Sequence, residues 1–164
     1  MKELVALAKA RPGTLAYGTT GIGSTGHLAS ALFQSMAKVE LLHLPYEGGA
    51  PAMVDLLAGE VQLTLASSPT VAPNISSGRL KPLAVTTLHR AKLFPQRPTV
   101  AKSGMPNHEA QSWYGFVVAA KTPAAIVARL NKEIVQILNR PETTEALLKS
   151  GMEPWRSTPD AFGA

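Results

Sequence analysis

Residues 17–28 read YGTTGIGSTGHL, and this stretch decides the fold. A short apolar strand leads into a turn rich in glycine and hydroxyl groups, after which Leu28, Leu32 and Met36 recur at helical spacing. The first turn of a helix leaves backbone N–H groups without partners, and the helix dipole adds partial positive charge there. Glycines let another molecule approach these amides closely, so the stretch predicts an anion-binding turn.

The same strand–turn–helix unit occurs three times along the chain. A strand over 40–44 leads into Pro-Tyr-Glu-Gly-Gly and a helix that begins near Pro51, and a strand over 61–65 leads into Ala-Ser-Ser-Pro and a third helix. Further strands are expected over 81–86 and 112–120, and further helices over 2–10, from 122 to 138 and from 141. Such units build an α/β fold with a mostly parallel sheet, flanked by helices, whose turns share one edge.

Composition excludes several classes of protein. The 164 residues are 45% hydrophobic and 16% charged and contain no cysteine, so we expect a packed domain without disulfides or thiolate zinc sites. No run of about 18 apolar residues could span a membrane. The opening residues, Met1 to Lys9, carry charges within an amphipathic helix pattern and do not read as a signal peptide.

The net charge of +5 is unevenly distributed. No Asp or Glu occurs from Val61 to His108, whereas this stretch contains Arg79, Lys81, Arg90, Lys92, Arg97 and Lys102. Two interpretations stay open, a positive field that gathers anions and a set of solvated loop faces. Nucleic-acid binding would need aromatic residues among these bases, and Phe94 is the only one, so no nucleic-acid partner is expected.

Motifs of catalysis are missing. The four histidines lack the spacing of metal ligands, Ile22 stands where a GxSxG elbow needs glycine, and no P-loop lysine motif is present. The sequence therefore predicts no catalytic residue, no metal and no cofactor. One alternative remains: the GxGxxG of the first turn, with Glu47 about 20 residues further on, is also typical of a dinucleotide-dependent enzyme. His27 either assists an anion or packs locally.

Five stretches together carry a family resemblance. They are YGTTGIGSTGHLASALF (17–33), HLPYEGGAPAMVDLLAGEVQL (43–63), SSPTVAPNISSGRLKPLAVTT (67–87), FPQRPTV with SGMP (94–106), and SWYGFVVAAKTPAAIVARLN (112–131). The chain resembles the receptors of tripartite tricarboxylate transporters, the TctC or Bug (Bordetella uptake gene) family. The resemblance implies a non-enzymatic periplasmic receptor of the type II periplasmic-binding-protein fold, which has two α/β lobes. Such receptors capture small carboxylates and deliver them to a membrane permease.

The resemblance also implies ligand contacts through backbone amides in three loops. The matching positions are Thr20, Gly21, Gly23, Ser24, Thr25 and Gly26 in the first loop, Tyr46, Gly48 and Gly49 in the second, and Ala66 and Ser67 in the third. Many relatives carry Asp or Asn where this chain has Ala66, which leaves the class of carboxylate open.

The first half of the family pattern, with its signal peptide, has no counterpart in these 164 residues. We therefore expect residues 1–112 to form lobe two, and residues 113–164 to form a crossover strand and helices that in relatives pack on lobe one. The expected location is the periplasm by resemblance, or the cytoplasm if the chain is a complete natural product. A single lobe should bind carboxylates with a Kd of about 1 mM or weaker. The apolar stripe of the 123–140 helix predicts a homo-oligomer, and a non-binding oligomeric remnant is the third interpretation.

Overall fold

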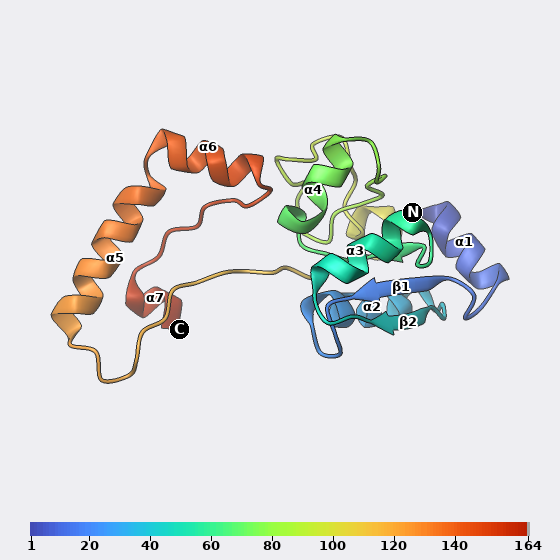
Figure 1. Ribbon diagram of the computed structural model, residues 1–164, viewed down its shortest axis with the longest axis horizontal. Coiled ribbons are helices and arrows are strands. Elements are labelled where there is room, and N and C mark those ends of the chain that lie inside the picture. The colour runs from blue at the N-terminus through green and yellow to red at the C-terminus, as the bar shows by residue number, and fades with distance from the viewer. Residues whose placement is uncertain (164) are drawn as a thin grey trace. The chain divides into compact units, whose positions relative to one another are not determined.

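The computed structural model describes residues 1–163, which divide into two compact units, Met1–Ser112 and a second unit that begins at Trp113 (Figure 1). The first unit contains a three-stranded sheet with helices, and the second unit is helical. Among the described residues, no helix combines the length and the apolar character that a membrane crossing requires.

The sheet of the first unit is parallel throughout, with strand order β2–β1–β3. Its strands are β1 (Ala16–Thr19), β2 (Leu42–Pro45) and β3 (Leu63–Thr64). Tyr17 of the central strand pairs with His43 on one side and with Leu63 on the other. Every residue of β1 is buried, as expected for a strand covered on both faces. The expected parallel sheet is confirmed, although its strands are shorter than the apolar runs that predicted them.

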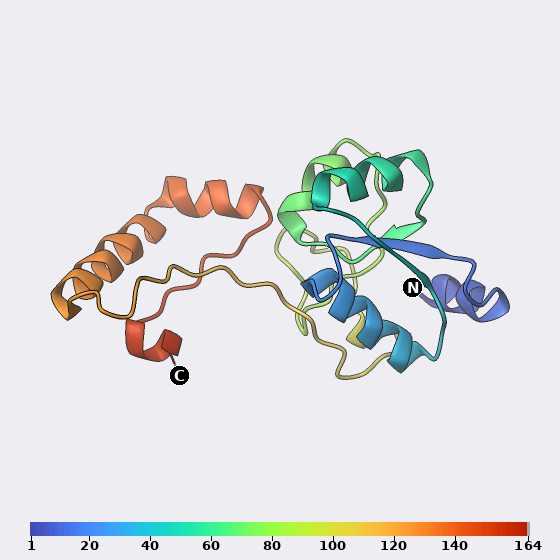
Figure 2. The same ribbon diagram turned by 60° about the horizontal axis from the view of Figure 1, so that its bottom comes forward.

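Helices connect the strands and cover both faces of the sheet. The chain runs through α1 (Lys2–Ala10), β1, α2 (Thr25–Ala37), β2, α3 (Gly49–Ala58), β3 and α4 (Ser68–Ser76). After β1 the chain forms β2 on one side of it. After β2 the chain crosses to the other side of β1 and forms β3 there. Right-handed connections then place α2 and α3 on opposite faces of the sheet (Figures 1 and 2). The three predicted strand–turn–helix units are confirmed.

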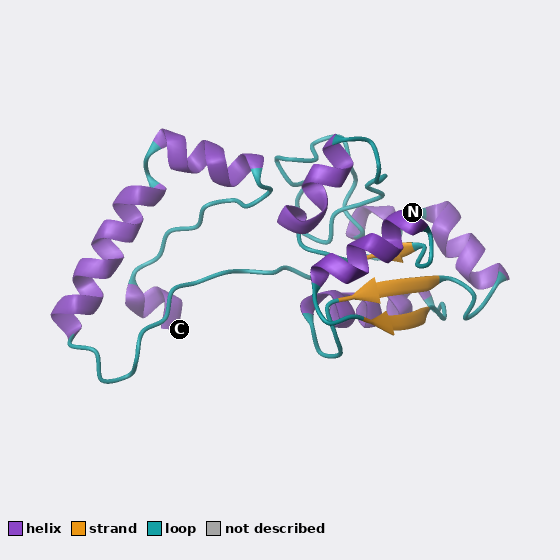
Figure 3. Cartoon of the chain, viewed as in Figure 1, coloured by secondary structure: helices purple, strands orange, loops and turns teal. Residues whose placement is uncertain are grey.

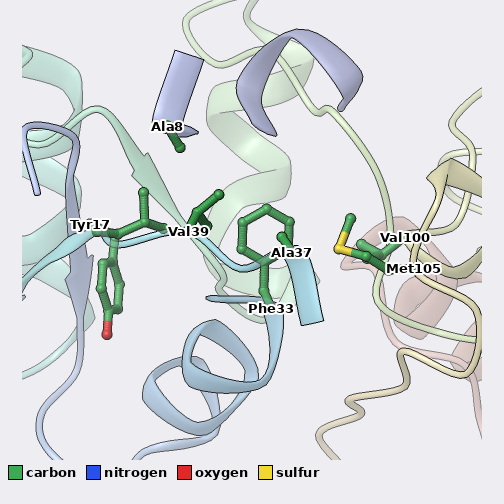
Figure 4. Close-up of a cluster of buried hydrophobic side chains, with 8 residues drawn as sticks. Ala8, Tyr17, Phe33, Ala37, Val39, Val100 and Met105 are labelled. Carbon is green, nitrogen blue, oxygen red and sulfur yellow. The ribbon is translucent and has the colours of Figure 1, made fainter. Parts of the chain in front are cut away.

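The buried core joins the first helix, the central strand and α2 to a later part of the chain (Figure 4). Its members are Ala8, Tyr17, Phe33, Ala37, Val39, Leu41, Val100 and Met105. Full burial of a side chain the size of Phe33 contributes about 1.5–3 kcal/mol. Because Val100 and Met105 belong to this cluster, the irregular chain after α4 is anchored to the same core as the sheet.

The strand expected over residues 81–86 is wrong. Only Val85 pairs there, through a single parallel bridge to Thr99. The Val85 N–H donates to Pro98 O at 3.0 Å, and the Val100 N–H donates back to Val85 O at 2.9 Å. Pro98 of the paired segment has no N–H to donate to Leu83 O, so the ladder does not continue toward residue 81. A short 3-10 turn, η1 (Ala101–Ser103), follows this bridge.

The strand expected over residues 112–120 is also wrong. Figure 3 draws this segment as loop, and all of its residues are exposed. A strand forms only where a second strand accepts and donates its backbone hydrogen bonds, and no strand of the described chain pairs with this apolar run. Trp113, at its start, instead meets the ring of Phe162 edge-on at a centroid distance of 5.6 Å.

The second unit contains three helices in the part that the structure describes. They are α5 (Ala124–Leu138), α6 (Pro141–Lys149) and α7 (Pro159–Gly163), and the expected helices from 122 and 141 are thereby confirmed. Pro141 opens α6, a position at which its missing N–H costs no helical hydrogen bond. The amide of Asn131 on α5 donates to Ser157 O at 2.9 Å, which ties the chain before α7 to α5.

Candidate functional site

Three loops meet at the carboxyl edge of the sheet, because all three strands run in the same direction. The first loop follows β1, the second follows β2, and the third follows β3. Their helices lie close together: a Cβ placed on Gly49 of α3 would lie 3.5 Å from Thr70 Cγ2 of α4 and 3.8 Å from Thr20 Cγ2 of the first loop. The structure therefore brings the three predicted loops together at one edge of the sheet.

The first loop owes its shape to glycine. Gly21 and Gly23 have φ values of 125° and 80°, which side-chain-bearing residues rarely adopt. Ser24 then caps α2, since its Oγ accepts the His27 N–H at 3.3 Å. Gly26, in the first turn of α2, packs directly on the end of β3: a Cβ there would lie 2.5 Å from Leu65 O.

Two amides of this loop are already hydrogen-bonded within it. The Gly21 N–H donates to Thr19 Oγ1 at 3.3 Å, and the Gly23 N–H donates to His27 Nδ1 at 3.2 Å. A ligand that used either amide would have to displace a side-chain acceptor. Thr20 and Thr25 of the predicted set have exposed side chains at the same loop.

The helices that follow the second and third loops begin without a side-chain cap. Gly48 is the N-cap of α3 and Ser67 that of α4, and within the described chain no side-chain oxygen accepts an N–H of either first turn. The Ser67 hydroxyl is hydrogen-bonded instead to Thr70 Oγ1 at 2.9 Å, and Ala66 beside it is exposed. Uncapped first-turn amides with a favourable dipole attract anions, so these two helix ends complement the first loop.

Tyr46 stands at the end of β2 with its hydroxyl turned to α3. The hydroxyl donates to Asp55 Oδ2 at 2.7 Å, and the Tyr46 N–H donates to Thr19 O at 3.0 Å. The hydrogen bond to Asp55 raises the pKa of Tyr46, with smaller contributions from burial and from the charges of Asp55 and Glu60. These two hydrogen bonds within the protein fix Tyr46, a predicted site residue, and Tyr46 thereby shapes the second loop.

Two residues of this edge were not predicted, Thr19 and His43. The buried Thr19 Oγ1 lies 2.7 Å from His43 Nε2 and also donates to Gly21 O at 3.2 Å, so it links the first loop to β2. His43 stacks on Tyr17 at 4.8 Å and on His27 at 4.5 Å. Burial lowers the pKa of His43, and the neighbouring His27 lowers it further. The contact between the Tyr17 and His43 rings follows from the pairing of these residues across the parallel strands β1 and β2. It was not predicted, because a single sequence does not show the strand register.

The rest of the described chain offers no competing metal site. Among residues 1–163, no group of three or more His, Asp or Glu side chains is placed to hold a metal ion. The candidate site is therefore the loop edge itself, a polar rim of backbone amides and hydroxyls from Thr20, Ser24 and Ser67.

Comparison with known proteins identifies the family. A profile of the tripartite tricarboxylate transporter family receptors, TctC, matches residues 1–162. The chain belongs to this receptor family. Among its TctC relatives, a Pseudomonas sp. (strain P51) protein named for the tcbD-tcbE intergenic region is 38% identical over 98% of this chain. A Pseudomonas knackmussii protein named for the clcB-clcD intergenic region is 38% identical over 87% of it. The resemblance stated from the sequence motifs is confirmed.

Solved TctC-type structures share the fold. The R. palustris protein Rpa4515 with adipate superposes with a TM-score of 0.95 at 37% identity, over 99% of this chain. The expected fold class, that of the TctC periplasmic binding proteins, is confirmed. The chain spans 48% of the Pseudomonas sp. relative and 55% of the R. palustris protein, but 85% of the P. knackmussii relative.

Proposed function

We propose that this chain is a solute-binding component of a tripartite tricarboxylate transporter, and that its first unit is one lobe of a site for a small organic carboxylate. In this proposal residues 1–112 supply half of the site and residues 113–164 form the element that packs against an opposing lobe. The receptor works in the periplasm, without catalysis, and hands its ligand to the membrane permease.

One observation carries the proposal: three helix N-termini meet at the carboxyl edge of one parallel sheet. The loops before α2, α3 and α4 lie together through Thr20, Gly49 and Thr70. A carboxylate placed there would receive backbone N–H groups and the positive ends of three helix dipoles, each worth about 0.3–1 kcal/mol for an anion. The R. palustris relative holds adipate, a dicarboxylate, which supports the same ligand class for this chain.

The affinity expected of this lobe alone is low. Periplasmic receptors of this kind close two lobes around a ligand, and closure both doubles the hydrogen bonds and excludes water. A Kd of about 1 mM corresponds to about −4.1 kcal/mol, a value that a few amide contacts and dipoles can supply. Tight binding by the chain alone would therefore contradict the half-site interpretation.

Binding is best measured by NMR on the full chain. Adipate and citrate are titrated to about 20 mM while the amide signals of Gly21, Gly23 and Gly49 are followed, with uncharged adipamide as the control for chain length. We expect saturable shifts at these loops with a Kd of about 1 mM or weaker for the acids and none for adipamide. Unchanged loop signals with both acids would refute carboxylate binding, and loop shifts with NAD alone would favour the dinucleotide alternative.

Matched serine variants locate the site. Ser67 lies at the N-terminus of α4, and Ser77 lies at the C-terminus of the same helix, where its Oγ donates to Asn74 O. Ser67→Ala and Ser24→Ala should weaken adipate binding severalfold, whereas Ser77→Ala should leave it unchanged. Equal effects of all three variants would argue against the helix N-termini as the binding groups.

The second unit should mediate association. Ile126, Leu130 and Ile137 of α5 are exposed by 50%, 43% and 44%, although they form the apolar stripe of this helix. Such a stripe is covered in a stable protein, so we propose that in isolation the chain associates through it. Light scattering at high concentration tests this: oligomers are expected, and Leu130→Glu should shift them toward the monomer. A monomer at all concentrations would refute it.

A further inference from the structure

The positive charge of the chain is concentrated in one stretch, residues 79–102, which we call the basic segment. It holds six basic side chains and no acidic one, whereas the rest of the chain has ten basic and eleven acidic side chains. The six are Arg79, Lys81, Arg90, Lys92, Arg97 and Lys102. The net charge of +5 therefore originates in the basic segment, and the remainder of the chain is close to neutral.

The basic segment is held by the core of the first unit. It runs beside α4 and is drawn in green to yellow in Figure 1. At its start the Arg79 N–H donates to Asn74 O of α4 at 2.9 Å, and near its end Thr99 and Val100 are buried. The Lys102 N–H donates to Thr99 Oγ1 at 3.1 Å. The backbone that carries these charges therefore has a fixed place in the unit.

Two contacts bring separate parts of the basic segment together. The parallel bridge between Val85 and Thr99 lays two stretches of the segment side by side. The guanidinium of Arg90 donates to Pro95 O at 2.7 Å, so it lies on the turn that precedes Arg97. Basic side chains that are distant in the sequence thus share one region of the surface.

Five of these cations have no anionic partner in the protein. Within residues 1–163, no carboxylate lies at ion-pair distance from Arg79, Lys81, Arg90, Arg97 or Lys102. Arg97 is half-buried and the other four are exposed. Like charges that are held together repel one another, and an anionic partner relieves this repulsion. Because the cations are spread over several turns, one small carboxylate cannot contact them all, so the segment favours an extended anionic surface.

A phospholipid surface fits these charges better than a folded acidic protein does. The cations lie on irregular chain, and a folded partner would need a carboxylate placed opposite each of them. Lipids diffuse laterally in a bilayer and bring their phosphates to the cations. Leu83 and Leu88, which are exposed by 38% and 41%, lie among the basic residues. Apolar side chains among basic ones are typical of segments that rest in the interface of a bilayer.

We propose that the basic segment docks the first unit onto a membrane surface that contains anionic phospholipids. Each Lys or Arg near such a surface strengthens binding about fivefold, so five cations give a partition coefficient on the order of 10³ M⁻¹ of accessible lipid. Binding of this strength is reversible, and it keeps the chain near the bilayer without anchoring it there.

Co-sedimentation of the full chain with vesicles measures this binding. Vesicles with about 30% phosphatidylglycerol in phosphatidylcholine are compared with pure phosphatidylcholine vesicles. At about 50 mM salt we expect half of the chain to bind at about 1 mM accessible anionic vesicle lipid, and none to bind pure phosphatidylcholine. At about 500 mM salt the binding should weaken at least about tenfold, because the charges are screened. No binding to the anionic vesicles, or binding that ignores salt, overturns the proposal.

Matched double variants locate the docking surface. Lys81→Gln with Lys102→Gln removes two exposed cations whose side chains make no hydrogen bond or ion pair among the described residues, so the fold should be kept. Lys2→Gln with Lys9→Gln removes the same charge from exposed positions of α1. The first pair should weaken vesicle binding about 25-fold and the second less than about threefold. Equal losses would mean that net charge alone drives binding, and would overturn the role of the basic segment.

An acidic protein surface is the competing partner, and poly-L-glutamate serves as its probe at the same salt concentration. A chain that binds poly-L-glutamate but not the anionic vesicles overturns lipid docking in favour of an acidic protein. The result is also separate from the carboxylate titration. Vesicle binding without adipate binding would support this inference while refuting the proposed function, and the reverse result would overturn this inference alone.

Discussion

The packing of α2 on β3 through Gly26 sets a quantitative expectation for stability. Gly26→Ala would place a methyl group 2.5 Å from Leu65 O, closer than a Cβ lies to a backbone atom in real structures. Because the obstacle is backbone, α2 must move away from the end of β3. Such overpacking costs about 1–3 kcal/mol or more, and the higher helix propensity of alanine returns at most about 1 kcal/mol. We expect a net loss of about 2 kcal/mol in the free energy of unfolding.

Gly49→Ala is the matched control. Gly49 also lies in the first turn of a helix after a glycine loop, but a Cβ there meets only Thr70 Cγ2 at 3.5 Å and Thr20 Cγ2 at 3.8 Å, which are ordinary contacts. Its φ is not positive, so alanine fits the backbone. This variant should be as stable as the parent chain or more stable by up to about 1 kcal/mol.

Urea unfolding followed by far-UV circular dichroism measures both variants. In thermal unfolding of the same proteins, the net loss for Gly26→Ala should lower the melting temperature by about 4–8 °C in a chain of this length, with Gly49→Ala unchanged or higher. The reasoning would be refuted by a Gly26→Ala protein as stable as the Gly49→Ala protein, because the approach of α2 to β3 would then not require glycine.

Three further substitutions test single contacts. His108 is fully buried and neither ring nitrogen has a partner among the described residues, so His108→Leu should raise the free energy of unfolding by about 1–3 kcal/mol; a lower urea midpoint would contradict this. Ser24→Ala removes the cap on the His27 N–H and should cost about 1 kcal/mol in the same assay. The Asp55 hydrogen bond raises the pKa of Tyr46, so the bond stabilises the fold below the ordinary tyrosine pKa of about 10 and is lost as the pH rises further. In Asp55→Asn the Tyr46 phenol should therefore ionise at lower pH, read by tyrosinate absorbance against Tyr46→Phe; an unchanged titration would exclude the contact.

The parts of the fold that local chemistry determines were predictable. Ser24 is a strong N-cap residue, Pro51 and Pro69 suit first turns, and Gly21 and Gly23 permit the positive φ of the loop between strand and helix. Each of these signals lies within a few residues of the feature it determines. The three units, their common direction and the shared loop edge follow from such local rules.

The parts that depend on distant partners were not predictable. The runs over 81–86 and 112–120 have the composition of strands, yet a strand exists only where another strand pairs with it. Likewise the Tyr46 hydroxyl could have faced a ligand, and its commitment to Asp55 depends on the angle at which α3 leaves the second loop. The stack of His27 on His43 depends on strand register, which hydrophobic patterns constrain only to within two residues.

The position of β1 in the sheet has a consequence for how the protein is made. β1 is first of the three strands in the chain but lies between the other two, so both of its edges stay unpaired while the ribosome adds the following segments. β2 closes one edge about 26 residues later, and β3 closes the other about 46 residues after β1. Until Leu63 has left the ribosome, Tyr17 keeps an open backbone edge to which another nascent chain could pair. This window, which the strand order alone creates, is the stage of synthesis at which a chaperone that covers exposed strand edges would protect the chain most.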